Sequence, residues 1–116
     1  MRHDEQFWSL ADALIARHPV VLDRPQGSTH PSFPDFLYPL DYGYLAGTTS
    51  MDGAGIDVWC GSIPEHPVTG VIVTIDLQKG DAEIKLLLGC TAEEAEVALA
   101  THQSGAQAGL VILRPA

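Results

Sequence analysis

The middle of the chain contains two apolar runs that are separated by a short polar turn. Residues 68–77 and 83–88 are rich in β-branched and other aliphatic side chains, and a Gln-Lys-Gly-Asp segment lies between them at residues 78–81. Two strand-forming runs joined by so short a turn predict a β-hairpin. This segment constrains the fold most, because it fixes one antiparallel pair of strands around which every other element must pack.

Helices are predicted on both sides of the hairpin. Apolar residues recur at helical spacing across residues 4–17, and Pro19 ends that run. Thr91 followed by Glu94 has the form of a capping box, which predicts a second helix that continues to about Gln103. The fold is therefore predicted to be α+β, with a mainly β centre and one helix near each end of the chain.

Shorter strands are predicted around the hairpin. Residues 20–22, 56–61 and 110–113 are brief apolar runs of the kind found in strands. Residues 23–37 contain several prolines, which have no N–H to donate to a sheet, so this stretch is predicted to be a loop. No internal repeat or break in composition divides the 116 residues, and a single domain over residues 1–116 is expected.

An excess of acidic residues disfavours some classes of partner. The chain has 15 Asp and Glu against 6 Lys and Arg, which gives a formal net charge of -9. Such a surface repels a nucleic-acid backbone, so no nucleic-acid partner is predicted. The first six residues carry charges of both signs, which is typical of neither a signal peptide nor a membrane span. The expected location is the cytoplasm, where Cys60 and Cys90 would be reduced core residues.

Two carboxylates lie on a glycine-rich segment that leads into the strand predicted at residues 56–61. The segment reads Asp-Gly-Ala-Gly-Ile-Asp, from Asp52 to Asp57. Closely spaced carboxylates are the hard oxygen ligands that Mg²⁺ prefers, with coordination positions left for water and phosphate. A solvated Asp-Gly turn is the commoner use of such residues, and this segment alone favours the turn.

A second motif, located upstream, changes that interpretation. Residues 38–45 read Tyr-Pro-Leu-Asp-Tyr-Gly-Tyr-Leu. Together the two segments resemble the soluble inorganic pyrophosphatase family, in which a Tyr-Pro-x-Asp-Tyr-Gly-aromatic-Ile segment precedes an Asp-Gly-Asp-Pro-hydrophobic-Asp-Val signature. The resemblance is strong over residues 38–58 and weaker over residues 20–28 and 71–87, and the predicted helix at residues 7–17 has no counterpart in the family.

The resemblance implies a small OB-like closed β-barrel with the N-terminal and C-terminal helices packed outside it. It also implies a homo-oligomer that uses Mg²⁺ to hydrolyse pyrophosphate, or that acts on another small phosphate compound. The resemblance assigns metal binding to four carboxylates, Asp52, Asp57, Asp81 and Glu83. It assigns substrate binding to Tyr38, Tyr42 and Lys85. Asp23 aligns with a glutamate of the family's early strand, and is either a pocket residue or a polar strand end.

Several residues of the family are missing, which predicts weak activity. The central Asp of the signature, which serves the family as a general base, is Ala54 here. A phosphate-binding Arg is lost with a deletion before Tyr38, and a Tyr-Lys pair of the family reads His102-Gln103. Loss of a general base alone commonly costs about 10²- to 10⁴-fold in rate. Two functions therefore stay open: a slow Mg²⁺-dependent enzyme, or a non-catalytic descendant that binds a ligand or forms an oligomer.

The histidines do not have the spacing of a metal site. The chain contains five, His3, His18, His30, His66 and His102. None forms an i, i+4 pair or an HExxH-like pattern, so they are predicted to lie at the surface. Trp59 is predicted to lie in the core or at a subunit interface.

Overall fold

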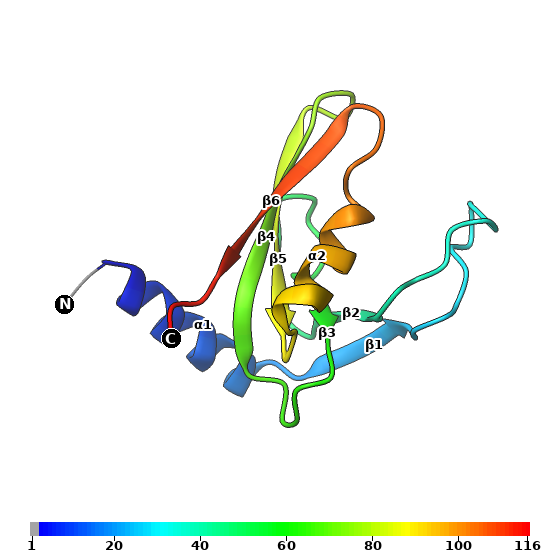
Figure 1. The fold of residues 1–116 in the computed structure, drawn as a ribbon. Helices are drawn as coiled ribbons and strands as arrows, with labels where there is room; N and C mark the ends of the chain where they lie inside the picture. Colours follow the sequence, from blue (N-terminus) through cyan, green and yellow to red (C-terminus); the bar gives the residue numbers. More distant parts are fainter. Residues whose placement is uncertain (1–2) are drawn as a thin grey trace.

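A six-stranded mixed sheet runs through the computed structural model, which describes residues 3–116 apart from the side chain of His3 (Figure 1). The elements follow in the order α1 (His3–Arg17), β1 (Val20–Arg24), β2 (Asp41–Leu45), β3 (Asp57–Cys60), β4 (Val68–Asp76), β5 (Asp81–Leu88), α2 (Ala92–Ala100) and β6 (Gln107–Leu113). Across the sheet the strands lie in the order β1-β2-β3-β5-β4-β6. All neighbours are antiparallel except β3 and β5, which run parallel.

The sheet is open, so the closed β-barrel implied by the family resemblance is wrong. β1 pairs with β2, and a barrel would also require β1 to pair with a strand at the other end of the sheet. The free side of β4 is instead occupied by β6, which pairs with it from Gly70 opposite Leu113 to Asp76 opposite Gln107. β1 and β6 therefore remain as two separate edges.

Local sequence signals located most of the elements correctly. The predicted hairpin is β4 and β5, whose last paired residues are Asp76 and Asp81. The capping box is confirmed: the Thr91 hydroxyl accepts a hydrogen bond from the Glu94 N–H at 3.1 Å, and the Glu94 carboxylate accepts one from the Thr91 N–H at 2.9 Å. The second helix ends at Ala100, slightly before the predicted end.

β2 was not predicted as a strand. Its sequence, Asp41–Leu45, contains an Asp and a Gly, which are depleted in strands. The structure explains the glycine, because a Cβ at Gly43 would overlap the carbonyl oxygen of Val21 on β1. Close approach of two backbones, which a local pattern does not reveal, thus selects the residue at this position.

The two faces of the sheet form two separate hydrophobic clusters. The α1 face packs Trp8 and Ala11 of α1 against side chains that include Val58 and Leu86. The α2 face packs against helix α2 and holds two buried aromatic side chains. The buried residues of this cluster are Tyr38, Leu40, Trp59, Ile72, Leu87, Cys90, Ala95 and Ala98. Alternation along each strand therefore sends neighbouring residues into different environments.

In the described part of the chain, no helix has both the length and the apolar composition needed to cross a membrane.

Candidate functional site

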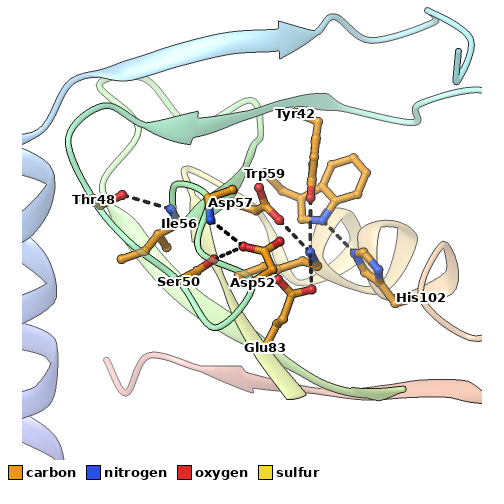
Figure 2. A network of polar contacts seen from close by, with 11 residues as sticks. Tyr42, Thr48, Ser50, Asp52, Ile56, Asp57, Trp59, Glu83 and His102 are labelled. Atoms are coloured by element: carbon orange, nitrogen blue, oxygen red, sulfur yellow. Dashed lines mark hydrogen bonds and ion pairs between the residues drawn. The ribbon is translucent and has the colours of Figure 1, made fainter. Parts of the chain in front are cut away.

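Lys85 is buried on the α2 face, and its ammonium group lies among oxygen atoms. Three side chains supply these oxygen atoms, Tyr42, Asp57 and Glu83, and Figure 2 shows them converging on one place. The Nζ atom is 2.9 Å from Oδ2 of Asp57 and 3.8 Å from Oε2 of Glu83. It also donates a hydrogen bond to the Tyr42 hydroxyl at 3.2 Å. A buried ammonium costs several kcal/mol unless it is paired, and Lys85 is only 5% exposed, so these oxygen atoms are what allow it to lie here.

The strand order brings these side chains together from distant parts of the sequence. Tyr42 on β2 is the register partner of Trp59 on β3. Val58 pairs with Leu86 across the parallel contact between β3 and β5, which places Asp57 near Lys85. Thus the two segments that resemble the pyrophosphatase motifs meet on one face of the sheet.

Asp52 joins the same group from the loop between β2 and β3. Its Oδ1 atom accepts hydrogen bonds from the Ser50 hydroxyl at 2.6 Å and from the Ala54 N–H at 2.9 Å. These two hydrogen bonds hold the pKa of the Asp52 carboxyl below its usual range. The loop is also tied by the Ile56 N–H, which donates to the Thr48 hydroxyl at 2.9 Å. Asp52 is therefore an exposed carboxylate on a well-fixed loop.

Glu83 connects Asp52 with the buried part of the group. Burial raises the pKa of Glu83, the negative charges of Asp52 and Asp57 raise it further, and Lys85 opposes them. The Glu83 and Asp52 carboxyl groups thus influence the pKa of each other. The two carboxyl groups are therefore close enough to interact, and a cation between them would relieve their repulsion. We call Tyr42, Asp52, Asp57, Glu83 and Lys85 the Lys85 cluster.

An aromatic wall borders the Lys85 cluster. The ring of Tyr42 lies 4.5 Å from Trp59 and 5.6 Å from Tyr38, measured between ring centroids. Burial, followed by the negative charge of Asp57, raises the pKa of the Tyr42 hydroxyl far above its usual value. The hydroxyl therefore stays protonated and can donate a hydrogen bond to Asp57 while it accepts one from Lys85.

His102 is the functional candidate that the sequence patterns missed. Its predicted surface position is wrong: the side chain is buried, and its Nε2 atom accepts a hydrogen bond from the Trp59 indole at 3.1 Å. The neutral ring must therefore carry its proton on Nδ1. Burial and then the positive charge of Lys85 lower the pKa of His102 to about 4. The spacing between His102 and Trp59 is not characteristic of any motif. The one feature of the sequence that pointed to His102 was its alignment with a tyrosine of the pyrophosphatase family.

The structure brings together most of the site residues predicted from the sequence. Tyr38 lies in the aromatic wall beside the cluster, and Trp59 is a core residue as predicted. Asp81 pairs with Asp76 at the turn end of the hairpin, and within the described residues no ion pair or hydrogen bond connects it to the Lys85 cluster. Asp23 is exposed on β1, where it pairs with Arg24 at 3.2 Å. Its position corresponds to a polar strand end.

Two carboxylates, Asp52 and Glu83, are the candidate ligands for a divalent cation. In residues 4–116, no group of three or more His, Cys, Asp and Glu has the arrangement of a metal centre. Lys85 holds Asp57 closely, at 2.9 Å, and Glu83 only at 3.8 Å, so Asp52 and Glu83 are the carboxylates that an ion could bind at less cost. Mg²⁺ is commonly bound by one or two carboxylates, with water and substrate phosphate completing its coordination. The Asp52 and Glu83 pair fits that kind of site.

No protein-family model matches this chain, and no curated protein or solved structure is significantly similar to it. The chemistry of the Lys85 cluster and the short motif resemblance are therefore the basis for assigning a function.

Proposed function

We propose that the protein is a divergent relative of the soluble inorganic pyrophosphatases, and that it binds pyrophosphate or another small phosphate compound together with Mg²⁺. One observation carries this proposal: Tyr42, Asp57 and Glu83 converge on the buried ammonium of Lys85. The resemblance selected these residues from three separate segments of the sequence, and pairing between β2, β3 and β5 brings the segments together. A cytoplasmic location is part of the proposal, and the free thiols of Cys60 and Cys90 are compatible with it.

Each side chain has a role that follows from its place. Lys85 and the protonated Tyr42 hydroxyl can donate hydrogen bonds to phosphate oxygens. The contact between Lys85 and Glu83 is long, at 3.8 Å, so a phosphate oxygen can replace that carboxylate at less cost than it can replace Asp57. Glu83 would then be available, with Asp52, to hold Mg²⁺. The bound ion would neutralise phosphate charge and lower the pKa of a water molecule.

Hydrolysis should be much slower than in complete members of the family. Ala54 has a methyl group where the family has the carboxylate that takes the proton from water. Lys85 is also short of cationic support, because Arg24 pairs with Asp23 and Arg114 pairs with Asp12 elsewhere. Charge that develops on the leaving phosphate would be poorly balanced, which raises the barrier to phosphoryl transfer.

A second candidate function is ligand binding without catalysis. Ala54 favours it, and so does the engagement of Lys85 by Asp57, which makes the cluster a stable part of the fold even without substrate. Phosphate release from pyrophosphate in the presence of Mg²⁺ separates the two functions. Measurable release that depends on Lys85 indicates a slow enzyme, and binding without release indicates the non-catalytic descendant.

Thermal melting with Mg²⁺ and a non-hydrolysable pyrophosphate analogue tests the proposed binding. We expect the two ligands together to raise the melting temperature of the parent protein, since ligand that binds only the folded state stabilises it. Asp52→Asn should lose most of this gain, because the amide keeps the turn but removes the ligand charge. Asp35→Asn, in the exposed loop before β2, is the matched control and should keep the gain. No gain in the parent, or an equal gain in Asp52→Asn, would contradict the proposal.

A further inference from the structure

The two edges of the sheet are protected to different degrees. Exposed strand edges invite pairing with other chains, and proteins usually protect them with charges, prolines or bulges. β1 has Asp23, Arg24 and an irregularity in its register between Leu22 and Arg24. β6 reads Gln-Ala-Gly-Leu-Val-Ile-Leu and is the only one of the described strands without a charged residue. It also has no proline and no register shift against β4.

The backbone groups of β6 that face away from β4 can be identified from their partners. The Gly109 N–H and carbonyl bond to the Gln103 side chain at 3.0 and 3.2 Å. Gln107 is bonded through both backbone groups to Ser104. Odd-numbered residues therefore face outward, which agrees with the Arg114 N–H donating inward to Thr69 of β4.

This alternation leaves the second half of the edge open. Val111 and Leu113 are the next residues whose N–H and carbonyl groups face outward. Within the described part of the chain, no hydrogen bond reaches these outward groups. Ser104 and the side chain of Gln103 thus protect only the first half of β6. The second half offers two donors and two acceptors to another strand.

The side chains beside this open edge are apolar. Leu110 is 66% exposed and Ile112 is 49% exposed, and both lie on the α1 face. Leu110 lines a hollow of about 610 Å³ together with Met51 and Ile75. Ile112 lines a second hollow of about 520 Å³ beside Phe7 and Trp8 of α1. An edge with open backbone groups therefore borders an apolar surface that α1 leaves uncovered.

We propose that two copies of the protein pair through the outer edges of their β6 strands, antiparallel and centred on Ile112. In this register Val111 of each copy faces Leu113 of the other, and every open N–H finds an open carbonyl. The two Ile112 side chains then meet on the α1 face of a continuous sheet, and Leu110 of each copy lies opposite position 114 of the other, where Arg114 is held by Asp12. This interface is independent of the function proposed for the Lys85 cluster.

A second copy fits this edge better than a different partner does. Antiparallel pairing about a two-fold axis needs one patch that complements itself, and the open groups of Val111 and Leu113 meet that condition. Each chain carries a net charge of -9, which would repel another copy at most surfaces. β6 is uncharged, so pairing there brings two acidic chains together without carboxylates from the paired strands.

The mass of the protein in solution gives the first test. We expect sedimentation and light scattering to give twice the 12.4 kDa chain mass at micromolar to millimolar concentration. Ile112→Lys should shift the mass to that of a single chain, because a charge at the centre blocks edge pairing. Val97→Lys, at a position with 47% exposure on α2, matches the exposure of Ile112 and should leave the dimer intact. A single-chain mass for the parent, or a dimer that survives Ile112→Lys, would overturn the proposal.

A cysteine scan tests the register. Residues facing each other at a non-hydrogen-bonded antiparallel position have Cα atoms about 4.5 Å apart, which is within the range for a disulfide. Ile112→Cys should therefore form an intermolecular disulfide under mild oxidation. Leu110→Cys should not, because its two copies would lie about 13 Å apart along the strands. Cys60 and Cys90 are buried and give little background. Crosslinking at Leu110 instead of Ile112 would rule out the proposed register.

Discussion

The two faces of the sheet bury different chemistry although they share the same strands. Lys85 and Leu86 are consecutive in β5, yet Lys85 enters the polar cluster on the α2 face and Leu86 enters the apolar cluster on the α1 face. The α2 face is enclosed by aromatic side chains and α2, whereas part of the α1 face lies beyond the reach of α1. The buried charge of Lys85 thus lies on the well-packed α2 face, whereas the exposed apolar side chains lie on the part of the α1 face that α1 does not cover.

Removal of the buried ammonium should produce the largest effect on stability. Lys85→Met leaves Asp57, Glu83 and Tyr42 without their cation, and breaking one side of a buried pair costs about 3 to 5 kcal/mol. The loss should shrink as the pH falls, because protonated carboxyl groups no longer need a cation. Urea unfolding at neutral and acidic pH measures both effects. Lys79→Met, in the exposed turn of the hairpin, is the control and should change the free energy of unfolding by less than about 0.5 kcal/mol.

The neighbouring residue on the other face should show a large effect without this pH dependence. Leu86→Ala creates a cavity in the α1-face cluster and should cost about 2 to 4 kcal/mol. No group of this cluster titrates between acidic and neutral pH, so the difference in the free energy of unfolding between Leu86→Ala and the parent should be the same at both pH values. If instead the Leu86→Ala deficit also shrinks in acid, the two faces are not electrostatically distinct.

Acid should weaken the fold through His102. Its pKa falls from an ordinary 6.5 to about 4 on folding, so the unfolded chain binds the extra proton between these values. Stability from this residue is fully present above about pH 6.5 and is lost as the pH falls toward 4, by about 2 to 3 kcal/mol. His102→Gln keeps an acceptor for the Trp59 indole and removes the titration. Its stability should therefore fall less between pH 7 and 4.5 than that of the parent, whereas exposed His66→Gln should behave like the parent.

Restoring the missing carboxylate should give the smallest effect. Ala54→Asp places a third acidic group beside Asp52, which should cost roughly 0.5 to 1 kcal/mol in chelator. Mg²⁺ should recover that loss and stabilise the variant more than it stabilises the parent, because each added oxygen ligand binds the ion. Hydrolysis should rise only partly, since no phosphate-binding cation is restored.

Thermal melts in chelator and in Mg²⁺ check this prediction, with exposed Ala106→Asp as the control for charge alone. If Mg²⁺ stabilises Ala54→Asp no more than it stabilises Ala106→Asp, then Asp52 is not part of a metal site.

Sequence reasoning succeeded where one segment determines its own structure. The helix stop at Pro19, the capping box at Thr91 and the turn between β4 and β5 are all local signals, and each marks an observed element. Whether the sheet closes depends on which strand takes the free side of β4. That choice is a competition between β1 and β6, which lie at opposite ends of the chain, and no local pattern decides it.

The candidate site was predictable in part for the same reason. Tyr42, Asp52 and Asp57 belong to two short motifs that the family resemblance assigned to one site, so the sequence was enough to group them. The contact between Lys85 and Asp57 required the strand register as well. His102 contacts Trp59 across a sequence separation of 43 residues, and neither residue type nor spacing identifies that pair.

The parallel pairing of β3 with β5 also determines when the site can form during folding. β4 and β5 are joined by a short turn and close a short loop when they pair, whereas β3 and β5 close a much longer loop, so we expect their pairing to come later. On that order, Lys85 gains its close ion pair with Asp57 only when β3 packs against β5. A substitution that weakens this ion pair should mainly accelerate unfolding and leave the folding rate almost unchanged. The Lys85 cluster would then control the unfolding rate, and with it the lifetime of the folded state.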